Sequence, residues 1–277
     1  MAKLLKGTAF ITGAASALQF AAAGVQRLVL ADINADALAA VVALLREQHA
    51  DVEVMSLELD AAAVKAGLEG AQQRFGRIDI AVNNAGTSGS GKPTHQLEEA
   101  EWLGLTDILL NGVWRCQKEE LAIMVEQEIP SSSPREGRGC IINVASIYGL
   151  VAHDTAVAYT AAKHGKQHTA EVFLKGHPQA DHEGVVGLTR ADALRYGPQG
   201  IRINAIAPGF TETPLLTNPM RRDPATAAAL TVNIEMAPMG RMATVEEIAD
   251  CIVFLASPMS SFVHGSVLVA DGGYTAG

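Results

Sequence analysis

The sequence predicts a single α/β domain over residues 1–277, built on a doubly wound parallel sheet of seven strands. Short apolar runs rich in Val, Ile and Leu alternate along the chain with segments of helical pattern. Strands joined through helices form right-handed crossovers, which place parallel strands in one sheet with helices on both faces. With 48% hydrophobic residues the chain can bury a large core, and one domain is a simpler interpretation than two small ones.

The seven predicted strands are short apolar segments. In chain order they are Thr8–Thr12, Arg27–Asp32, Val52–Leu57, Ile78–Val82, Cys140–Val144, Ile201–Ile206 and Ser266–Val269. Polar residues or glycines stand at the carboxyl ends of five of them, namely Thr12-Gly13, Asp32, Asn83–Gly86, Ser146 and Pro208-Gly209. Because ligands of parallel α/β sheets bind at the carboxyl ends of the strands, this edge is the predicted binding site.

Composition excludes several classes of partner. The formal net charge of −9 and the lack of a Lys/Arg cluster argue against nucleic acid or an anionic membrane surface. Cys116, Cys140 and Cys251 are far apart, so neither a disulfide framework nor a zinc site is indicated. The chain begins without an apolar signal core or a membrane-spanning segment. We therefore expect a cytoplasmic protein.

Tyr159 and Lys163 form a Tyr-x-x-x-Lys pattern, which places both side chains on one face of a helix. An ammonium beside a phenol favours the ionised phenol, so the tyrosine becomes usable as an acid or base near neutral pH. Ser146, thirteen positions before Tyr159, could hold a carbonyl or alcohol against the phenol. Taken alone, the pattern equally fits a surface tyrosine packed on a lysine stem.

The order and spacing of these motifs resemble the short-chain dehydrogenase/reductase family from about residue 6 to residue 274. The motifs are Thr12-Gly13-Ala-Ala-Ser16, Asp32, Asp60, Asn83-Asn-Ala-Gly86, Ser146, Tyr159-x-x-x-Lys163, Arg202-Ile-Asn204, Pro208-Gly209 and Asp271-Gly-Gly273. The resemblance implies a Rossmann fold and hydride transfer between a nicotinamide cofactor and the carbonyl or alcohol carbon of a small molecule. It implies that Tyr159 exchanges the proton, that Lys163 lowers its pKa and holds the ribose hydroxyls, and that Ser146 orients the substrate.

The resemblance also implies a set of cofactor-binding residues: Gly13, Ser16, Asp32, Asp60, Asn84, Gly86, Tyr159, Lys163, Pro208, Gly209 and Thr211. A carboxylate at Asp32 would accept hydrogen bonds from the adenosine ribose and repel a 2′-phosphate, so NAD is favoured over NADP. Asp32 could also cap the helix that follows it. Asp60 would lie near the adenine, while Asn83 and Asn84 could instead tie neighbouring strands together.

The glycine-rich turn departs from the family pattern. Thr12–Ser16 is followed directly by Ala17–Gly24, and Asp32 stands only nineteen positions after Gly13. The loop and helix are shorter by roughly six residues than a complete dinucleotide-binding unit. We therefore expect a stretched first crossover, a poorly ordered segment between Gly13 and Gly24, and low dinucleotide affinity.

Two further departures lie in the catalytic half. Leu109 stands where the family usually has a catalytic Asn; its backbone carbonyl could still hold a relay water if the helix kinks there. Asn111 lies about 200° further round a helix and is not an obvious substitute. Residues 166–184 form an atypical insertion with Gly176 and Pro178, which terminate helices.

The insertion also contains His168, His177 and His182, which we interpret as part of a solvated loop, so no metal is expected. A retained intron is one hypothesis for this segment, because its removal restores the family pattern.

Two functions of different class follow. The first is an active NAD(P)-dependent oxidoreductase whose substrate pocket would be lined by Leu150, His153, Asp154 and the stretch 210–242. The second is a catalytically impaired relative that serves as a binding or scaffolding protein with weak cofactor affinity. The family resemblance implies a homodimer or homotetramer, in which the helix bearing Tyr159 packs near a two-fold axis.

Overall fold

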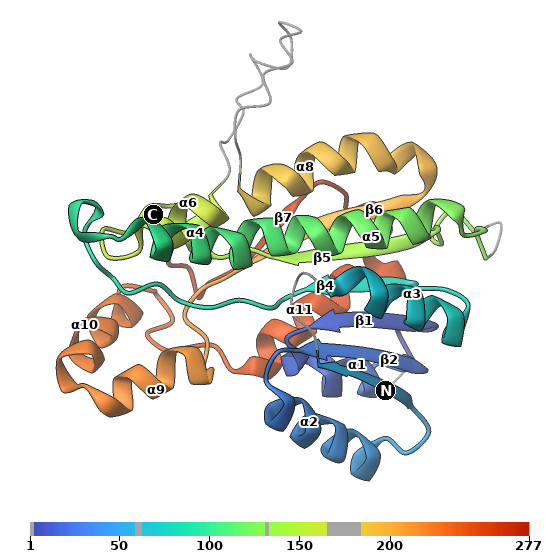
Figure 1. Ribbon diagram of the computed structural model, residues 1–277, viewed down its shortest axis with the longest axis horizontal. Helices are drawn as coiled ribbons and strands as arrows, with labels where there is room; N and C mark the ends of the chain where they lie inside the picture. Colours follow the sequence, from blue (N-terminus) through green and yellow to red (C-terminus); the bar gives the residue numbers. More distant parts are fainter. Residues whose placement is uncertain (1–2, 59–62, 131–132, 165–183, 277) are drawn as a thin grey trace, which may run out of the picture.

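The computed structural model describes residues 3–58, 63–130, 133–164 and 184–276, and it confirms the predicted α/β fold. Seven parallel strands form one sheet in the order β3-β2-β1-β4-β5-β6-β7, with helices on both faces (Figure 1). Within the described residues, no helix is long and apolar enough to span a bilayer.

All seven strands lie within about two residues of their predicted bounds. They are β1 (Thr8–Thr12), β2 (Arg27–Asp32), β3 (Glu53–Glu58), β4 (Ile80–Asn83), β5 (Gly139–Val144), β6 (Ile201–Pro208) and β7 (Val267–Ala270). The sequence reveals them because strands buried on both faces are continuous apolar runs.

The helices of the described residues are α1 (Ala17–Ala22), α2 (Ala35–Gln48), α3 (Val64–Phe75), α4 (Glu99–Thr106), α5 (Gly112–Glu126), α6 (Val157–Lys163), α8 (Val185–Tyr196), α9 (Pro214–Arg222), α10 (Pro224–Glu235) and α11 (Val245–Ala256). Layers of helices cover both faces of the sheet, whereas α9 and α10 pack on each other beside it (Figure 1). Alternate residues of each strand face opposite layers, so Ile11 packs with α1, α2 and α11, whereas Phe10 packs with α3, α5 and α8.

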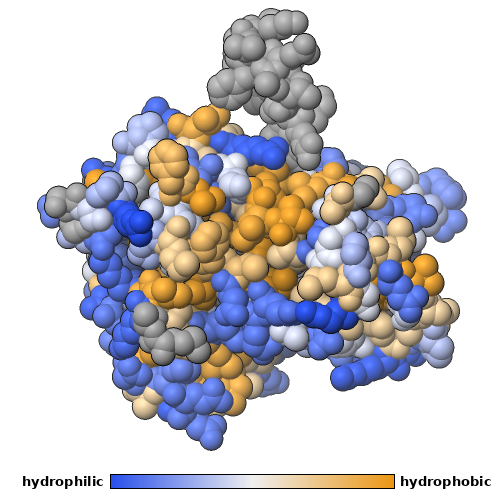
Figure 2. All heavy atoms as spheres, turned by 180° about the vertical axis from the view of Figure 1, so that it is seen from behind, coloured by the Kyte–Doolittle hydropathy of each residue, from blue (hydrophilic) through white to orange (hydrophobic). Residues whose placement is uncertain are grey.

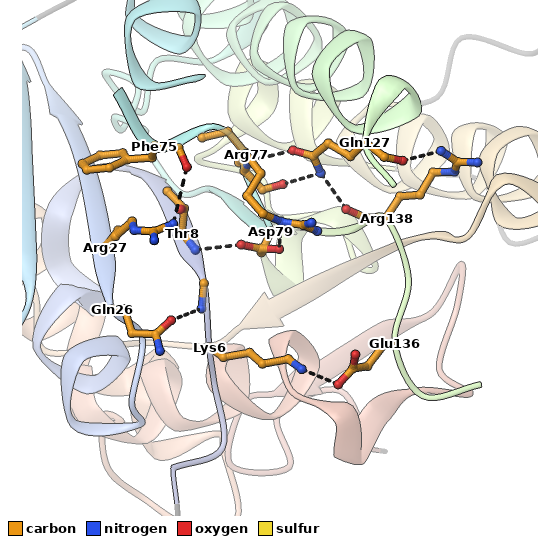
Figure 3. A network of polar contacts seen from close by, with 12 residues as sticks. Lys6, Thr8, Gln26, Arg27, Phe75, Arg77, Asp79, Gln127, Glu136 and Arg138 are labelled. Atoms are coloured by element: carbon orange, nitrogen blue, oxygen red, sulfur yellow. Dashed lines mark hydrogen bonds and ion pairs between the residues drawn. The ribbon is translucent and has the colours of Figure 1, made fainter. Parts of the chain in front are cut away.

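Polar contacts fix the amino-terminal edge of the sheet (Figure 3). Asp79 accepts hydrogen bonds from the amide of Thr8 at 2.8 Å and from Arg77 Nε at 2.6 Å. Gln127 bonds both backbone groups of Ile78, at 2.7 and 3.0 Å, and the carbonyl of Arg138 at 2.7 Å. These contacts join the starts of β1, β4 and β5 and leave the carboxyl edge free for a binding site.

The first crossover is short but regular, so the expectation of a poorly ordered segment between Gly13 and Gly24 is wrong. A 3-10 turn, η1 (Ala14–Ser16), leads directly into α1, whose Phe20 is fully buried. A 3-10 turn rises about 2.0 Å per residue instead of 1.5 Å, and so extends the short connection. The amide of Leu5 then bonds the carbonyl of Ala23 at 2.9 Å and fixes the end of the helix.

The helix that begins with α6 is interrupted, as predicted, and resumes with α8. Residues 165–183 lie outside the described part of the chain, whereas their two flanks, His164 and Gly184, are in direct contact. The amide of Gly184 bonds the carbonyl of His164 at 2.6 Å. A Cβ on Gly184 would lie 2.3 Å from the carbonyl oxygen of Ala162, so this junction requires a glycine.

We predict that a variant lacking residues 166–184 keeps the fold. Gly165 then stands between His164 and Val185, which preserves the single glycine of the junction. Circular dichroism and thermal unfolding are expected to show a cooperative transition at or above that of the full chain. Replacing the junction glycine of this variant by Ala should lower its melting temperature. Loss of the transition in the deletion variant itself would contradict the prediction.

Candidate active site

Ser146 and Tyr159 meet at the carboxyl edge of the sheet. Ser146 follows β5 and precedes a 3-10 turn, η4 (Ile147–Gly149), and its hydroxyl accepts the amide hydrogen of Tyr148 at 3.2 Å. Tyr159 comes from the first turns of α6 and is half-buried. Burial raises the pKa of the Tyr159 phenol, and a hydrogen bond with Ser146 lowers it. Ser146 therefore lies close to the phenol of Tyr159.

Lys163 is buried, only 3% exposed, and its Nζ donates to the carbonyl of Val144 at 2.7 Å. Burial lowers the pKa of this lysine to about 8. The hydrogen bond to Val144 fixes the ammonium against the end of β5. The lowering of the Tyr159 pKa by Lys163 stays a prediction.

Thr12, at the end of β1, organises the segment after β4. Its Oγ1 accepts the amide hydrogens of Asn84 and Ala85, both at 3.1 Å. The side chain of Asn84 donates to the carbonyl of Gly13 at 2.6 Å. Asn84 thus ties neighbouring strands together, which is the alternative interpretation of this residue. The sequence placed Thr12 at the predicted binding edge but did not assign it this organising role.

Asp32 lies half-buried at the end of β2, where the resemblance places it. Its Oδ1 accepts the amide hydrogen of Asn34 at 2.9 Å, whereas the N-cap of α2 is Asn34, which accepts from the amide of Ala37 at 3.0 Å. Asp32 is therefore not the helix cap. Asp60 lies outside the described residues.

The buried hydroxyl of Ser16 has no hydrogen-bond partner among the described residues. It stands at the start of α1, in the crossover that a dinucleotide would approach. An unpartnered buried hydroxyl fits a position that a bound ligand completes.

Pro208, Gly209 and Thr211 follow one another at the end of β6. The amide of Gly209 bonds the carbonyl of Ala270 at 2.9 Å, and Thr211 Oγ1 bonds the carbonyl of Gly209 at 3.3 Å. A Cβ on Gly209 would lie 2.8 Å from the Cα of Asp271. Only glycine allows this approach, so the three residues line the same edge as Ser146.

Leu109 is fully buried in a π-helical turn, Asp107–Asn111, between α4 and α5. Its side chain packs in a cluster with Ala158 and Tyr159. A π-turn departs from regular helical hydrogen bonding. It therefore supplies the kink that we named as the condition for the Leu109 carbonyl to hold a relay water. Asn111 is exposed and bonds Asp107 at 3.1 Å, so it does not substitute.

Gly86 lies close to this turn. A Cβ on Gly86 would lie 3.3 Å from Leu109 Cδ2. A side chain at this position would therefore press on the leucine that packs beside Tyr159.

Tyr148 is the aromatic neighbour of Tyr159 among the ring contacts of the described residues. The ring of Tyr148 lies 4.9 Å from that of His153 and 6.3 Å, edge to face, from that of Tyr159. Phe210 and Tyr274 form a second edge-to-face pair at 5.7 Å. Burial raises the pKa of Tyr148, and charge on Tyr274 and Tyr159 raises it further. The Tyr148–Tyr159 pair and the Phe210–Tyr274 pair are therefore neighbours. Tyr148 and Tyr274 were missed, although Tyr148 stands only two positions after Ser146.

Leu150 and His153 are half-buried after η4, and Asp154 is exposed beside His153 at 3.4 Å. A cavity of about 520 Å³ adjoins Phe210. Its lining includes residues of α11 and the end of β7 but none of the three catalytic candidates.

Among the described residues there is no group of three or more His, Cys, Asp or Glu side chains that could hold a metal ion. His168, His177 and His182 lie outside the described part of the chain.

Comparison with known proteins agrees with this geometry. A family model described as short chain dehydrogenase matches residues 7–181, and one described as enoyl-(acyl carrier protein) reductase matches residues 177–275. The cis-4-hydroxycyclohexanecarboxylate dehydrogenase of Sinomonas cyclohexanicum is 36% identical over 97% of this chain and 96% of its own. The cyclohexanol dehydrogenase of an Acinetobacter strain is 33% identical over 98% of this chain and 94% of its own.

Among solved structures, levodione reductase superposes with a TM-score of 0.83 at 35% identity, over 98% of both chains. The matched family model spans more than half of the chain, and the full-length relatives exceed 30% identity. They are dehydrogenases and reductases, which favours an oxidoreductase over a scaffolding protein. The chain therefore belongs to the short-chain dehydrogenase/reductase family and is an oxidoreductase of that family.

Proposed function

We propose that this oxidoreductase transfers a hydride between NAD and the carbonyl or alcohol carbon of a small molecule, with Tyr159 as the acid/base. The observation that carries the proposal is that Ser146 lies close enough to the phenol of Tyr159 to lower its pKa, at the carboxyl edge of the sheet where Lys163 is also buried. Lys163 is buried one helical turn after Tyr159, on the same helix, which supports a role for its ammonium in the same site.

The nicotinamide ring supplies the hydride acceptor or donor when the cofactor is bound. Tyr159 Oη passes a proton to, or takes it from, the substrate oxygen. Ser146 Oγ already accepts the amide hydrogen of Tyr148, so its own hydrogen is available for the phenol or the substrate oxygen. Burial lowers the pKa of Lys163 to about 8, which brings it closer to neutral pH, where a group that exchanges protons is most effective.

The aromatic rings near Tyr148, the neighbour of Tyr159, support an apolar, ring-shaped substrate. Tyr148, Phe210 and Tyr274 present aromatic surface, which packs well against flat or chair-shaped carbon rings. Two relatives are named for cyclohexane derivatives. We infer that a medium-sized alicyclic alcohol or ketone is the substrate class.

The residues fit a nicotinamide nucleotide at its ribose ends better than at its pyrophosphate. Asp32 supplies a carboxylate for the adenosine ribose, and Tyr159 and Lys163 supply a hydroxyl and an ammonium for the nicotinamide ribose. After Ser16, α1 has only six residues, and it begins with Ala17. A glycine at this point would let the backbone approach a phosphate more closely than alanine does. We therefore propose NAD as the cofactor, bound weakly.

We also infer a homo-oligomer, a dimer or tetramer. Figure 2 shows apolar side chains gathered across the middle of the face opposite to that of Figure 1. β7 is an edge strand, and Val269 on it and Phe262 before it are exposed. Exposed apolar edges of this kind favour pairing between chains. Light scattering at several protein concentrations tests this.

Replacing Tyr159 by Phe removes one hydroxyl without changing the ring volume. We expect kcat to fall by about 10²–10⁴-fold, while the melting temperature and the nucleotide affinity change little. Steady-state kinetics with a cyclic ketone and NADH measure the effect, and Tyr196→Phe at the end of α8 serves as the control. A Tyr159→Phe variant with most of the wild-type rate would remove Tyr159 from the mechanism.

Replacing Asp32 by Ser removes the repulsion between its carboxylate and a 2′-phosphate. Because this repulsion is lost, we expect the affinity for NADPH relative to NADH to rise by about tenfold or more. A tenfold rise corresponds to about 1.4 kcal/mol. Fluorescence titration with both nucleotides measures the ratio, with the exposed Asp36→Ser as the control. An unchanged ratio would refute the role of Asp32 in cofactor choice.

The short first crossover predicts weak dinucleotide binding. Each lost charge-assisted hydrogen bond is worth roughly 1.5–3 kcal/mol. Two of them would weaken binding by about 10²–10⁴-fold. Inserting Gly-Ile-Gly-Arg-Ala-Thr between Ser16 and Ala17 is expected to raise NADH affinity, measured by fluorescence titration.

A second insertion of six alanines at the same place separates the length of the crossover from its glycines. Micromolar or tighter NADH binding by the unmodified chain would contradict the prediction of weak binding.

A further inference from the structure

Glu120 is a fully buried acid on α5, beneath the carboxyl edge of the sheet. It belongs to the buried stripe of that helix, together with Cys116, Leu121 and Met124. An acidic residue on such a stripe is unusual, because burying a carboxylate without compensating partners is costly.

The partners of Glu120 are amides at the ends of two adjacent strands. Asn83 Nδ2, at the end of β4, donates to Glu120 Oε2 at 3.1 Å and to Asn143 Oδ1, on β5, at 3.0 Å. Asn143 Nδ2 in turn donates to Gln117 Oε1 at 2.6 Å and to Thr189 Oγ1 at 2.9 Å. Both hydrogens of each asparagine amide are therefore used.

Two atoms of this network have no hydrogen-bond partner among the described residues: Asn83 Oδ1 and Glu120 Oε1. Both are acceptors when the acid is ionised, and they belong to two side chains already in contact. Two acceptors cannot bond each other. One proton on Glu120 Oε1 turns that atom into a donor and supplies both atoms with a partner.

We propose that Glu120 is a neutral carboxylic acid in the folded protein, that it donates its proton to Asn83 Oδ1, and that it acts as a positioning residue for the active site. Amide and acid then bond in both directions, as two complementary planar groups do. A half-satisfied buried network is thereby completed.

The surroundings of Glu120 favour the neutral form. Burial raises the pKa of Glu120 to about 8, and the hydrogen bond from Asn83 lowers it only in part. On α5, the Cys116 thiol lies near enough for the charge of Glu120 to raise its pKa. From α8, Asp192 reaches the network through Gln117 at 2.6 Å. These neighbours are acidic, so none of them compensates an ionised Glu120.

The other elements around Glu120 contribute no charge of their own at this point. The buried residues of α3, which packs on α5, are apolar or glycine, and the strand residues are the two asparagines. Lys163, on α6, donates its Nζ to the carbonyl of Val144 on β5, so it pairs with the backbone of that strand and not with Glu120.

The position of Glu120 connects it to both halves of the site. Asn83 directly precedes Asn84, which holds the carbonyl of Gly13. Asn143 directly precedes Val144, the acceptor of Lys163. A charge on Glu120 would therefore disturb the nucleotide side and the lysine together, without Glu120 touching either ligand.

Glu120→Gln in the full chain tests the proposal, because its amide offers the same donor without a titrating proton. An unfolded glutamate has a pKa of about 4.3. Since the folded-state pKa is raised above that value, the proton stabilises the fold fully below pH about 4.3, and this stability is lost as pH rises towards 8.

We expect the unfolding equilibrium constant of the wild type, divided by that of Glu120→Gln, to rise about tenfold per pH unit between pH 5 and 8 and to level off above 8. Denaturant titrations at several pH values measure this ratio. Glu126→Gln, on the exposed side of the same helix, is expected to show no such rise.

Two further readouts separate positioning from packing. The infrared band of a protonated carboxylic acid is expected in the wild type at pH 7 and absent in Glu120→Gln. The alkaline loss of kcat/KM is expected to be shallower in Glu120→Gln. Glu120→Leu, which removes one acceptor of Asn83 Nδ2 and the proposed donor to Asn83 Oδ1, should lose activity at every pH. A ratio of unfolding constants that stays flat from pH 5 to 8, or an absent carboxylic-acid band, would overturn the proposal in favour of an ionised Glu120 bridged by water.

Discussion

The hydrogen bond between the side chains of Asn83 and Asn143, 3.0 Å long, fixes the register on which the site depends. The register places these two residues opposite each other on β4 and β5, and Thr12 opposite Asn83 on β1. One residue further along each strand come Gly13, Asn84 and Val144. A slip of one residue would turn every side chain to the other face of the sheet. Thr12 secures the same register from the other side through the amides of Asn84 and Ala85.

The strands and the edge that carries the site could be predicted because they depend on local patterns. A buried parallel strand reads as an apolar run, and its carboxyl end is where polar residues such as Ser146 collect. Contacts between elements could not be predicted in the same way. Nothing in the spacing of Tyr159 and Lys163 indicates that the lysine bonds β5, and nothing near Asn84 indicates that its amide turns back to Gly13. Such partners are set by the packing of segments distant in sequence.

The first crossover shows where a geometric argument from sequence fails. Comparing the lengths of the helix and the strand correctly showed that the connection between β1 and β2 is short. It did not include the 3-10 turn before α1, which is more extended per residue than an α-helix. Leu109 is a similar case. The sequence alone did not decide whether the helix kinks at this residue, and the chain forms a π-turn there. Glu120 did carry a signal that was missed. It falls three and four positions after Gln117 and Cys116 on one helical face, so an acid stands on a stripe that the fold buries.

Two buried groups of opposite charge type flank the same pair of strands. The pKa of Lys163 is lowered to about 8 and that of Glu120 is raised to about 8, in both cases chiefly by burial. As pH rises through this value, the lysine loses a positive charge while the glutamate gains a negative one. Both changes make the site more negative, in a chain whose net charge is already −9. A dinucleotide is itself an anion, so under the proposed function we expect cofactor binding to weaken in alkaline solution. If Glu120 is neutral as we propose, its ionisation disturbs the strand register in the same pH range, and burial is the common cause of both effects.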